Sequence, residues 1–323
     1  MRGSDGLAGR TALVTGSSRG LGLLIAGELA ARGCRVMLCG RDGAALDRAR
    51  QQLADRPGEV AATVCDLAQP NAPERLLGAV RERFGTEVDL LVNNAGTIQV
   101  GPVEAMAESD YRRAHEVMAM APLRLTLAVL PGMRARGGGS IVNVTSIGGR
   151  IPAPHLLPYV AAKFAATGQS EGLAAELARH GIAVTTVLPG LMRTGSPTAA
   201  EFSGQAGREY AWFATAASLP LVSMDAERAA RRIVRAVELR RRELVLTPLA
   251  RAGVLAHGVA PATTGRLLAI AARLLPPPGT APEHGVPGTR AAGHHGPGST
   301  VHRLTALGRL AGRRNNEPQP RAS

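Results

Sequence analysis

The stretch that decides the fold is "TALVTGSSRGLG", residues 11–22, in which a β-branched apolar run meets a glycine-rich turn. Three glycines in it follow the spacing G-x3-G-x-G, and the residues after them are typical of a helix. Glycine lets the backbone turn sharply and approach a pyrophosphate, and the free amides of a helix N-terminus bind phosphate. The stretch therefore predicts a dinucleotide-binding turn, whose candidate contacts are Gly16, Ser18, Arg19, Gly20, Leu21 and Gly22.

Short apolar runs alternate with Ala-, Leu- and Arg-rich helical stretches from residue 10 to about residue 246. The seven runs are "TALVTG", "CRVMLCG", "EVAATVCD", "VDLLVNNAG", "GSIVNVTS", "IAVTTVLPG" and "ELVLTP". Strands separated by helices predict a parallel sheet covered on both faces, with right-handed crossovers. We therefore expect a doubly wound α/β domain with a seven-stranded parallel sheet over residues 1–247.

The composition changes after about residue 248, which predicts a C-terminal extension over residues 248–323. "PATTGRLLAIAARLLPPP" (261–278) predicts an amphipathic helix over about 261–275. Residues 279–300 are rich in Gly, Pro and His and are expected to be disordered, and a short helix is expected over 301–312. The amphipathic helix is expected to pack on its own domain or on a partner subunit, and peripheral membrane attachment is the alternative.

The net charge of +13 is distributed unevenly. Residues 247–323 contain nine arginines and two glutamates, so this segment alone contributes +7. A basic segment of this kind is usually a solvated surface, and it can also contact a partner or an anionic membrane. Aromatic residues are only 2% of the chain, and no nucleic-acid-binding module is recognised, so we expect no nucleic-acid partner.

Three further sequence features bear on location. There is no run of about 18 uncharged apolar residues, so no integral membrane span is expected. The N-terminal "MRGSDGLAGR" lacks the apolar core of a secretory signal. The three cysteines, Cys34, Cys39 and Cys65, have no CxxC spacing, which predicts buried thiols in a reducing cytoplasm and no metal site.

The basic residues are 37 arginines and one lysine, Lys163. In "PYVAAKFAA", Tyr159 precedes it by four residues, so the two side chains share one face of a helix. A nearby ammonium is expected to lower the tyrosine pKa from about 10, which would make Tyr159 a proton donor and acceptor. Ser146 ends an expected strand 13 residues earlier and is either a hydrogen-bond donor to a substrate carbonyl or a turn residue.

The charges near the expected adenosine site favour a particular cofactor. Arg41 follows Gly40, where NAD-preferring sheets place an acidic residue, and Arg19 lies in the glycine-rich turn. Two cations favour a 2′-phosphate, hence NADP(H) over NAD(H). Asp42 is expected to cap the next helix. Asp66, in "VCDLAQ", is either an acceptor for the adenine amino group or a turn residue.

Six motifs in this order resemble the short-chain dehydrogenase/reductase family over about residues 8–247. They are "TGSSRGLG", "CDL", "NNAG" (93–96), Ser146, "YVAAK" and "PGLMRT" (189–194). The resemblance implies a Rossmann-type fold, a homodimer or homotetramer, and hydride transfer between NAD(P)H and a carbonyl or alcohol. It implies catalysis by Ser146, Tyr159 and Lys163, the last also binding the nicotinamide ribose. It further implies cofactor contacts from Asn93, Ala95, Gly96, Tyr159, Pro189, Gly190 and Thr194, and no metal ion.

One position departs from the family pattern. In "VMAMA", Met118 stands where the family commonly has an asparagine, which bends the helix and holds a water linking the lysine to solvent. A thioether is a weak acceptor and no donor, so it cannot replace these hydrogen bonds. His115, one turn earlier, is a candidate substitute. Met118 is the main argument for the alternative function, a catalytically weak cofactor-binding protein whose basic tail contacts a partner or membrane.

Half of the eight aromatic residues lie within twelve positions, at Phe202, Tyr210, Trp212 and Phe213. This clustering predicts an apolar pocket wall, with Ile151, Leu156 and Leu157 opposite, and the alternative is that the aromatics anchor a mobile lid. We accordingly expect an NADPH-dependent oxidoreductase that acts on the carbonyl or alcohol of a small apolar substrate.

Overall fold

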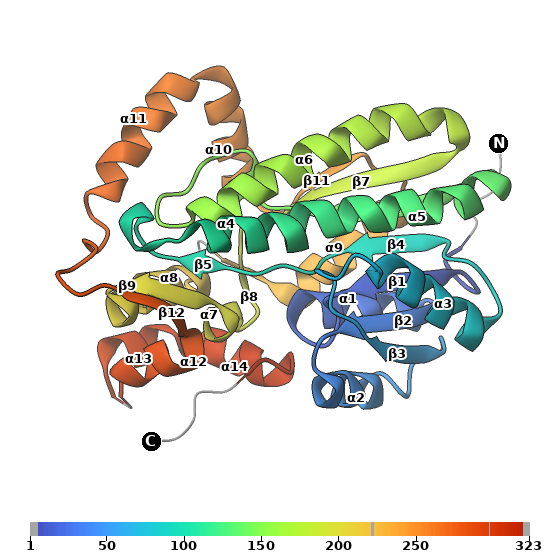
Figure 1. Ribbon diagram of the computed structural model, residues 1–323, viewed down its shortest axis with the longest axis horizontal. Helices are drawn as coiled ribbons and strands as arrows, with labels where there is room; N and C mark the ends of the chain where they lie inside the picture. The colour runs from blue at the N-terminus through green and yellow to red at the C-terminus, as the bar shows by residue number, and fades with distance from the viewer. Residues whose placement is uncertain (1–5, 221–222, 297, 319–323) are drawn as a thin grey trace.

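The computed structural model describes residues 6–220, 223–296 and 298–318. Its centre is a parallel seven-stranded sheet with the order β11-β7-β6-β4-β1-β2-β3 (Figure 1). The strands are β1 (Thr11–Thr15), β2 (Arg35–Gly40), β3 (Val60–Val64), β4 (Leu90–Asn93), β6 (Gly139–Val144), β7 (Ile182–Leu188) and β11 (Glu243–Val245). The seven strands are those that the apolar runs predict. The order reverses between β1 and β4, and open sheets bind ligands at the carboxyl ends of such strands.

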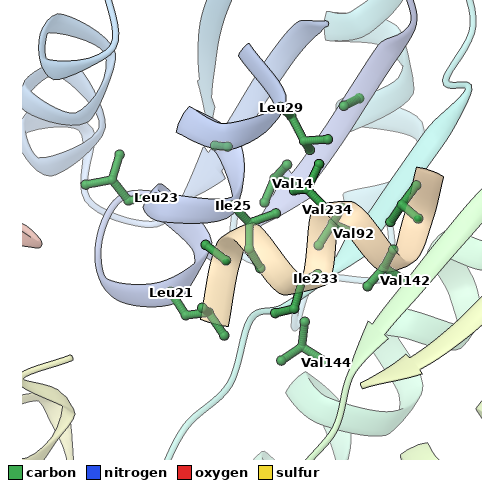
Figure 2. Packing of buried hydrophobic residues seen from close by; sticks show 14 of the residues in the cluster. Val14, Leu21, Leu23, Ile25, Leu29, Val92, Val142, Val144, Ile233 and Val234 are labelled. Carbon is green, nitrogen blue, oxygen red and sulfur yellow. The ribbon is translucent and has the colours of Figure 1, made fainter. Parts of the chain in front are cut away.

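Helices cover both faces of this sheet, as expected. One face carries α1 (Gly20–Ala31), α2 (Gly43–Gln52) and α9 (Ala226–Glu238), and the other carries α3 (Ala72–Phe84), α5 (Ala121–Ala135) and α6 (Leu157–Leu177). Figure 2 shows how α1 and α9 meet over the first face, where Ile25 and Leu29 approach Ile233 and Val234 above the valines of the strands. These side chains are fully buried, so the packing fixes where α1 begins.

A continuous helical segment precedes β6. It consists of α4 (Glu108–His115), a π-helical segment (Glu116–Met120) and α5. By length and hydropathy this helical segment, Glu108–Ala135, also meets the requirements of a membrane span. Its buried residues, among them Leu125, Val129 and Met133, pack in the core below the sheet, which is the ordinary environment of an apolar helix in a folded domain.

A small lobe lies beside the carboxyl edge of the sheet and joins two distant parts of the chain (Figure 1). It combines β5 (Gln99–Val100), α7 (Ser196–Ala199), β9 (Glu201–Gly204) and α8 (Ala206–Ser218) with β12 (Glu283–Pro287), α12 (Gly288–Ala291), α13 (Thr300–Leu304) and α14 (Ala306–Arg314). β12 pairs antiparallel with β9, and β9 pairs parallel with β5. The expectation of disorder over 279–300 is therefore wrong, because β12 gains its hydrogen bonds from a strand about 80 residues away.

The aromatic cluster forms the core of this lobe. Phe202, Tyr210 and Phe213 are at most 4% exposed, and the ring centroid of Phe202 lies 5.5 Å from that of Tyr210 and 6.1 Å from that of Phe213. Edge-to-face packing of this kind is typical of a hydrophobic core. The prediction that these three rings form the wall of a substrate pocket is wrong, because they pack against one another inside the lobe.

The remaining elements connect these parts. β8 (Leu191–Arg193) pairs with β10 (Ser223–Asp225) beside the lobe. Beyond β11, α10 (Pro248–Val259) and α11 (Pro261–Ala272) form a hairpin bent by 120°, and Figure 1 shows it standing away from the sheet. α11 is the helix expected over about 261–275. Single 3-10 turns lie at Val103–Ala105, Ile147–Gly149, Ala178–His180 and Ala292–His294.

Candidate active site

The glycine-rich turn between β1 and α1 has a geometry that requires glycine at each of its three positions. Gly16 and Gly20 adopt φ values of 63° and 58°, in the left-handed region. A Cβ at Gly16 would lie 2.7 Å from Cα of Ala95, and one at Gly22 would lie 2.3 Å from the carbonyl oxygen of Gly16. The turn is therefore as tight as the sequence predicts, and it directs the N-terminus of α1 toward the carboxyl edge of the sheet.

An asparagine outside the predicted set of contacts holds this turn. The Asn94 side-chain amide donates to the carbonyl oxygens of Thr15 and Gly16, at 3.0 and 3.1 Å. Its neighbour Asn93 donates to Oδ1 of Asn143 at 2.8 Å and thereby links β4 to β6. The sequence prediction includes Asn93, Ala95 and Gly96 of "NNAG" as cofactor contacts and leaves out Asn94. The second asparagine of this motif is the signal that could have identified it.

The expected adenosine end carries two cations. Arg41 follows β2 and is exposed, and Arg19 lies in the glycine turn with its side chain 36% exposed. Asp42 caps α2 by accepting from the Ala45 amide at 3.1 Å, as predicted, so its carboxylate is used away from any ribose. Asp66 accepts from the Ala68 amide at 3.1 Å, which makes it a turn residue in this structure. The Arg41 guanidinium is exposed here, and the Arg19 guanidinium faces the Glu317 carboxylate at 3.4 Å.

The loop after β7 lies at the same edge. The Pro189 carbonyl oxygen accepts from the Ile147 amide at 2.9 Å, which joins this loop to the turn that follows Ser146. Gly190 packs against Thr247 at the start of α10, where a Cβ would lie 3.3 Å from the threonine hydroxyl oxygen. Thr194 is 5% exposed, and its hydroxyl accepts from the Ser196 amide at 3.1 Å. The Thr194 oxygen is the acceptor in this bond, so the bond does not use the hydroxyl hydrogen.

Three predicted catalytic side chains meet at the end of β6. Ser146 follows the strand by two residues, and its Oγ accepts from the Gly148 amide at 2.9 Å. A Cβ on Gly148 would lie 3.3 Å from this Oγ and 3.4 Å from Cε1 of Tyr159, so the serine and the tyrosine flank the same glycine. Lys163, one turn farther along α6, donates from Nζ to the Val144 carbonyl oxygen at 2.8 Å.

Burial decides the protonation behaviour of the catalytic pair. It raises the pKa of Tyr159 above its usual 10, and a hydrogen bond with the Ser146 side chain offsets part of that rise. It lowers the pKa of Lys163 from 10.5 to about 8, because the 5% exposed ammonium is poorly solvated. The expectation of a lowered tyrosine pKa is therefore wrong, since burial of the phenol outweighs its hydrogen bond with Ser146.

Comparison with known proteins agrees with this geometry. The family model described as short chain dehydrogenase matches residues 10–202. The chain belongs to the short-chain dehydrogenase/reductase family. It is 39% identical over 185 residues to a Streptomyces violaceoruber protein named as a ketoacyl reductase of the granaticin polyketide synthase, which covers 57% of this chain and 68% of that one.

Two further similarities extend over more of the chain. A fatty acyl-CoA reductase of Acinetobacter baylyi is 31% identical over 276 residues, covering 84% of this chain and 87% of that protein. The crystal structure of L-sorbose reductase from Gluconobacter frateurii, complexed with NADPH and L-sorbose, superposes with a TM-score of 0.67 at 28% identity. That superposition covers 76% of this chain and 97% of the reductase. As a family member, the chain is an oxidoreductase.

The family resemblance attributes a bend in this helix to an asparagine, and a distortion is present here with Met118 at that position. Residues Glu116–Met120 form a π-helical turn, and Met118 at its centre is 2% exposed. Met118 packs in one cluster with Ala114 and Ala162, against which the Tyr159 ring also lies. π-turns are characteristic of functional sites, and this one places an apolar side chain where the family has an amide.

A small cavity lies beside Lys163. Its volume is about 10 Å³, roughly that needed by one water, and its lining includes Met118, Thr126, Asn143 and Lys163. Within residues 6–220, 223–296 and 298–318, the buried Thr126 hydroxyl has no hydrogen-bond partner, so it is a polar group suited to a water there. His115 instead contacts the Tyr111 carbonyl oxygen in its own helix, at 3.2 Å, and does not line this cavity.

The chain's own residues 315–318 lie across the glycine turn. The Asn315 carbonyl oxygen accepts from the Gly20 amide at 2.8 Å, and the Asn316 side chain donates to the Ser18 carbonyl oxygen at 2.7 Å. The Glu317 carboxylate lies 3.4 Å from Nε of Arg19 and 2.7 Å from the position of a Cβ on Gly20. A backbone carbonyl oxygen and the Glu317 side chain therefore lie against the turn that the sequence predicts to bind phosphate.

Proposed function

We propose that this chain is an NADPH-dependent reductase that converts the carbonyl group of an apolar substrate into an alcohol. The observation that carries the proposal is the meeting of Ser146, Tyr159 and the only lysine of the chain at the end of β6. This end lies at the edge of the sheet to which the glycine turn also opens.

Each side chain has a role that follows from its contacts. The Ser146 hydroxyl, whose oxygen accepts from Gly148, can still donate its hydrogen to a substrate carbonyl oxygen. Tyr159, with its raised pKa, stays protonated at neutral pH and gives its proton to that oxygen as the carbonyl carbon is reduced. Lys163 supplies a positive charge that stabilises the phenolate left behind. The NADPH that the site would bind supplies the hydride.

The preference for NADPH is supported by two arginines at the expected adenosine site and by similarity to proteins crystallised with NADPH. Arg19 and Arg41 both lie near the carboxyl ends of β1 and β2, and the nearby carboxylates of Asp42 and Asp66 accept from backbone amides. Guanidinium groups bind a phosphate with charge-assisted hydrogen bonds. L-sorbose reductase and the actinorhodin polyketide ketoreductase, which superposes with a TM-score of 0.65 at 30% identity, were both crystallised with NADPH.

An apolar substrate is supported by the surroundings of the catalytic end of α6. Leu157 and Phe164 are 42% and 41% exposed there, two residues before and five residues after Tyr159. Ile151, in the loop that connects Ser146 to α6, packs against Gly253 of α10. The fatty acyl-CoA reductase and the polyketide-associated relative are named for substrates with long apolar or carbon-rich chains.

The test is NADPH consumption with a series of 2-alkanones and alkanals of increasing length, with L-sorbose as a polar comparison. We expect kcat/KM to rise with chain length and to vanish in Tyr159→Phe. A rate that depends on NADPH but falls with chain length would refute the apolar substrate only. Binding of NADPH without turnover of any carbonyl would favour the alternative function, a catalytically weak cofactor-binding protein.

A further inference from the structure

The hairpin of α10 and α11 presents large apolar side chains to solvent. α11 has no buried residue, and Leu267 and Ile270 are 60% and 57% exposed. On α10, Leu255 and Val259 are 63% and 86% exposed. A helix of twelve residues is marginally stable in water unless a packed face supports it. Its apolar surface is therefore open to a partner from outside the described part of the chain.

The charge of the hairpin selects the kind of partner. Residues 244–282 contain no aspartate or glutamate, whereas Arg251, Arg266 and Arg273 are all exposed. The base of the hairpin is also strongly positive: burial and the neighbouring arginines 228, 241 and 251 lower the pKa of Arg232. Apolar side chains among arginines, without a carboxylate, are complementary to an anionic apolar interface.

We propose that the hairpin of α10 and α11 binds peripherally to an anionic lipid surface. Its leucines, isoleucine and valine would enter the interface, and Arg251, Arg266 and Arg273 would contact lipid phosphates. A second copy of this chain is the poorer partner. A twofold interface through the hairpin would bring like arginines together, and the segment offers no carboxylate to pair with them.

The position of the hairpin relates lipid binding to the catalytic domain. A cleft of about 380 Å³ separates α10 from α6, and Phe164, Thr167, Val254 and His257 are among its lining residues. The cleft is bounded by α6, which carries Tyr159 nearer its N-terminus, so a lipid surface at the hairpin would border the same helix. Delivery of an apolar carbonyl from lipid rests on the proposed function, whereas the binding itself does not.

The test is co-sedimentation of the full chain with vesicles, either of phosphatidylcholine alone or with phosphatidylglycerol added. We expect binding to the anionic vesicles, lost in the triple variant Leu255→Ser, Leu267→Ser, Ile270→Ser. Arg266→Gln and Arg273→Gln should each weaken binding about fivefold. The matched control, Val103→Ser with Leu127→Ser, removes exposed apolar side chains elsewhere and should bind as the wild type does.

Two outcomes would overturn the lipid proposal. One is failure of the full chain to sediment with either kind of vesicle. The other is a dimer, seen by analytical ultracentrifugation, that the triple variant abolishes while vesicle binding is unaffected. Neither outcome bears on carbonyl reduction, because a soluble short ketone measures that activity without vesicles.

A separate observation concerns residues 315–318. The Gly20 amide that the Asn315 carbonyl oxygen uses, and the Arg19 guanidinium that faces Glu317, are the groups assigned to cofactor phosphates. Residues of α2 also hold the segment: Arg48 donates to Oδ1 of Asn316 at 3.1 Å, and Gln52 donates to the Arg314 carbonyl oxygen at 3.3 Å. The Gly20 amide and the Arg19 guanidinium can each bind either an oxygen of residues 315–318 or an oxygen of a cofactor phosphate, but not both at once.

We infer that residues 315–318 compete with the dinucleotide and act as an internal inhibitor of cofactor binding. Asn316 adopts a left-handed φ of 57°, a conformation that asparagine tolerates, and this bend directs its amide into the turn. The contacts named above are hydrogen bonds and one ion pair, so release of the segment breaks polar interactions with the glycine turn and with α2.

The test is the dissociation constant of NADPH, measured from its fluorescence on binding to the full chain. Asn316→Ala with Glu317→Ala should bind NADPH about tenfold more tightly, which corresponds to a segment docked about nine-tenths of the time. Arg303→Ala, an exposed residue of α13 outside the turn, is the matched control and should change nothing. A peptide of residues 311–318, added to the double variant, should raise the apparent dissociation constant in competition with NADPH.

Weaker or unchanged NADPH binding by the double variant would refute the inference. Weaker binding would mean that the segment completes the cofactor site instead of blocking it. Because the readout is binding, a failure here leaves the proposed reduction untouched, and a lack of turnover leaves the competition measurable.

Discussion

The ammonium nitrogen of Lys163 lies 2.8 Å from the carbonyl oxygen of Val144, the last residue of β6. Ser146 follows Val144 by two residues, so one strand end positions both the cation and the catalytic hydroxyl. The same ammonium lies 5.7 Å from the centroid of the Tyr159 ring. A guanidinium at residue 163 would have to fit five donors into a space that the ammonium fills with one nitrogen.

Lys163→Arg should lower kcat by at least about tenfold and should also change its pH dependence. In the wild type, Lys163 loses its proton as the pH rises through about 8, so the rate should fall there. An arginine stays charged over this range, so the residual rate of the variant should lack that fall. Identical profiles for the two proteins would remove Lys163 as the origin of the decline.

Tyr159→Phe should lower kcat by about a thousandfold, since a positioned acid contributes roughly 10² to 10⁴. The NADPH dissociation constant should stay within about twofold, because the phenol hydroxyl is assigned to the substrate oxygen. Stopped-flow absorbance and NADPH fluorescence measure the two quantities. A variant that keeps near-wild-type turnover would show that another group delivers the proton.

Met118→Asn tests whether the missing family amide matters. The π-turn at Glu116–Met120 forms without it, and the cavity beside Lys163 already has the Thr126 hydroxyl. We therefore expect Met118→Asn to change kcat by less than about threefold. Thr126→Val, which keeps the shape and removes the hydroxyl, should slow turnover more than that. A large acceleration by Met118→Asn would instead show that proton delivery is impaired in the wild type.

The cofactor preference is tested by Arg41→Asp. Loss of a charge-assisted contact to the 2′-phosphate should lower the NADPH-to-NADH ratio of kcat/KM by at least about tenfold. Arg50→Asp, an exposed arginine in the last turn of α2, makes the same change of charge and is the control. Equal ratios in the two variants would assign the preference to overall charge.

NADPH affinity should also depend on Glu317. Burial raises the pKa of this carboxyl from 4.5 to about 7, and the facing Arg19 offsets part of the rise. Docking of residues 315–318 is therefore favoured fully below 4.5 and loses that contribution as the pH rises through about 7. Apparent NADPH affinity should increase several-fold across this window. Glu317→Gln should remove that increase and leave only the titration of the cofactor phosphate. If NADPH affinity has the same pH dependence in Glu317→Gln as in the wild type, Glu317 is not its origin.

Sequence predicts the features that depend on local geometry. The left-handed φ values of Gly16 and Gly20 follow from glycine spacing after an apolar run, and the Tyr159–Lys163 face follows from helix periodicity. The direction of the Tyr159 pKa shift is predicted wrongly, because a sequence shows the neighbouring lysine but not the burial of the phenol, which raises the pKa.

The features that sequence did not predict depend on contacts between distant segments. β12 has no periodicity of its own, and its pairing with Phe202 and Glu201 of β9 gives it a strand conformation. The aromatic cluster was visible as a composition signal, but only the position of β12 and α12 shows that it is closed from solvent.

The contact between Ser18 and Asn316 joins residues 298 positions apart. Contacts of such long sequence separation form slowly, because closure of the loop costs entropy before the contact offers any gain. During refolding the central sheet should therefore be complete, with its glycine turn open, before residues 315–318 arrive. A molecule refolded with NADPH present would meet the cofactor first, so its loading should be faster than that of the native protein.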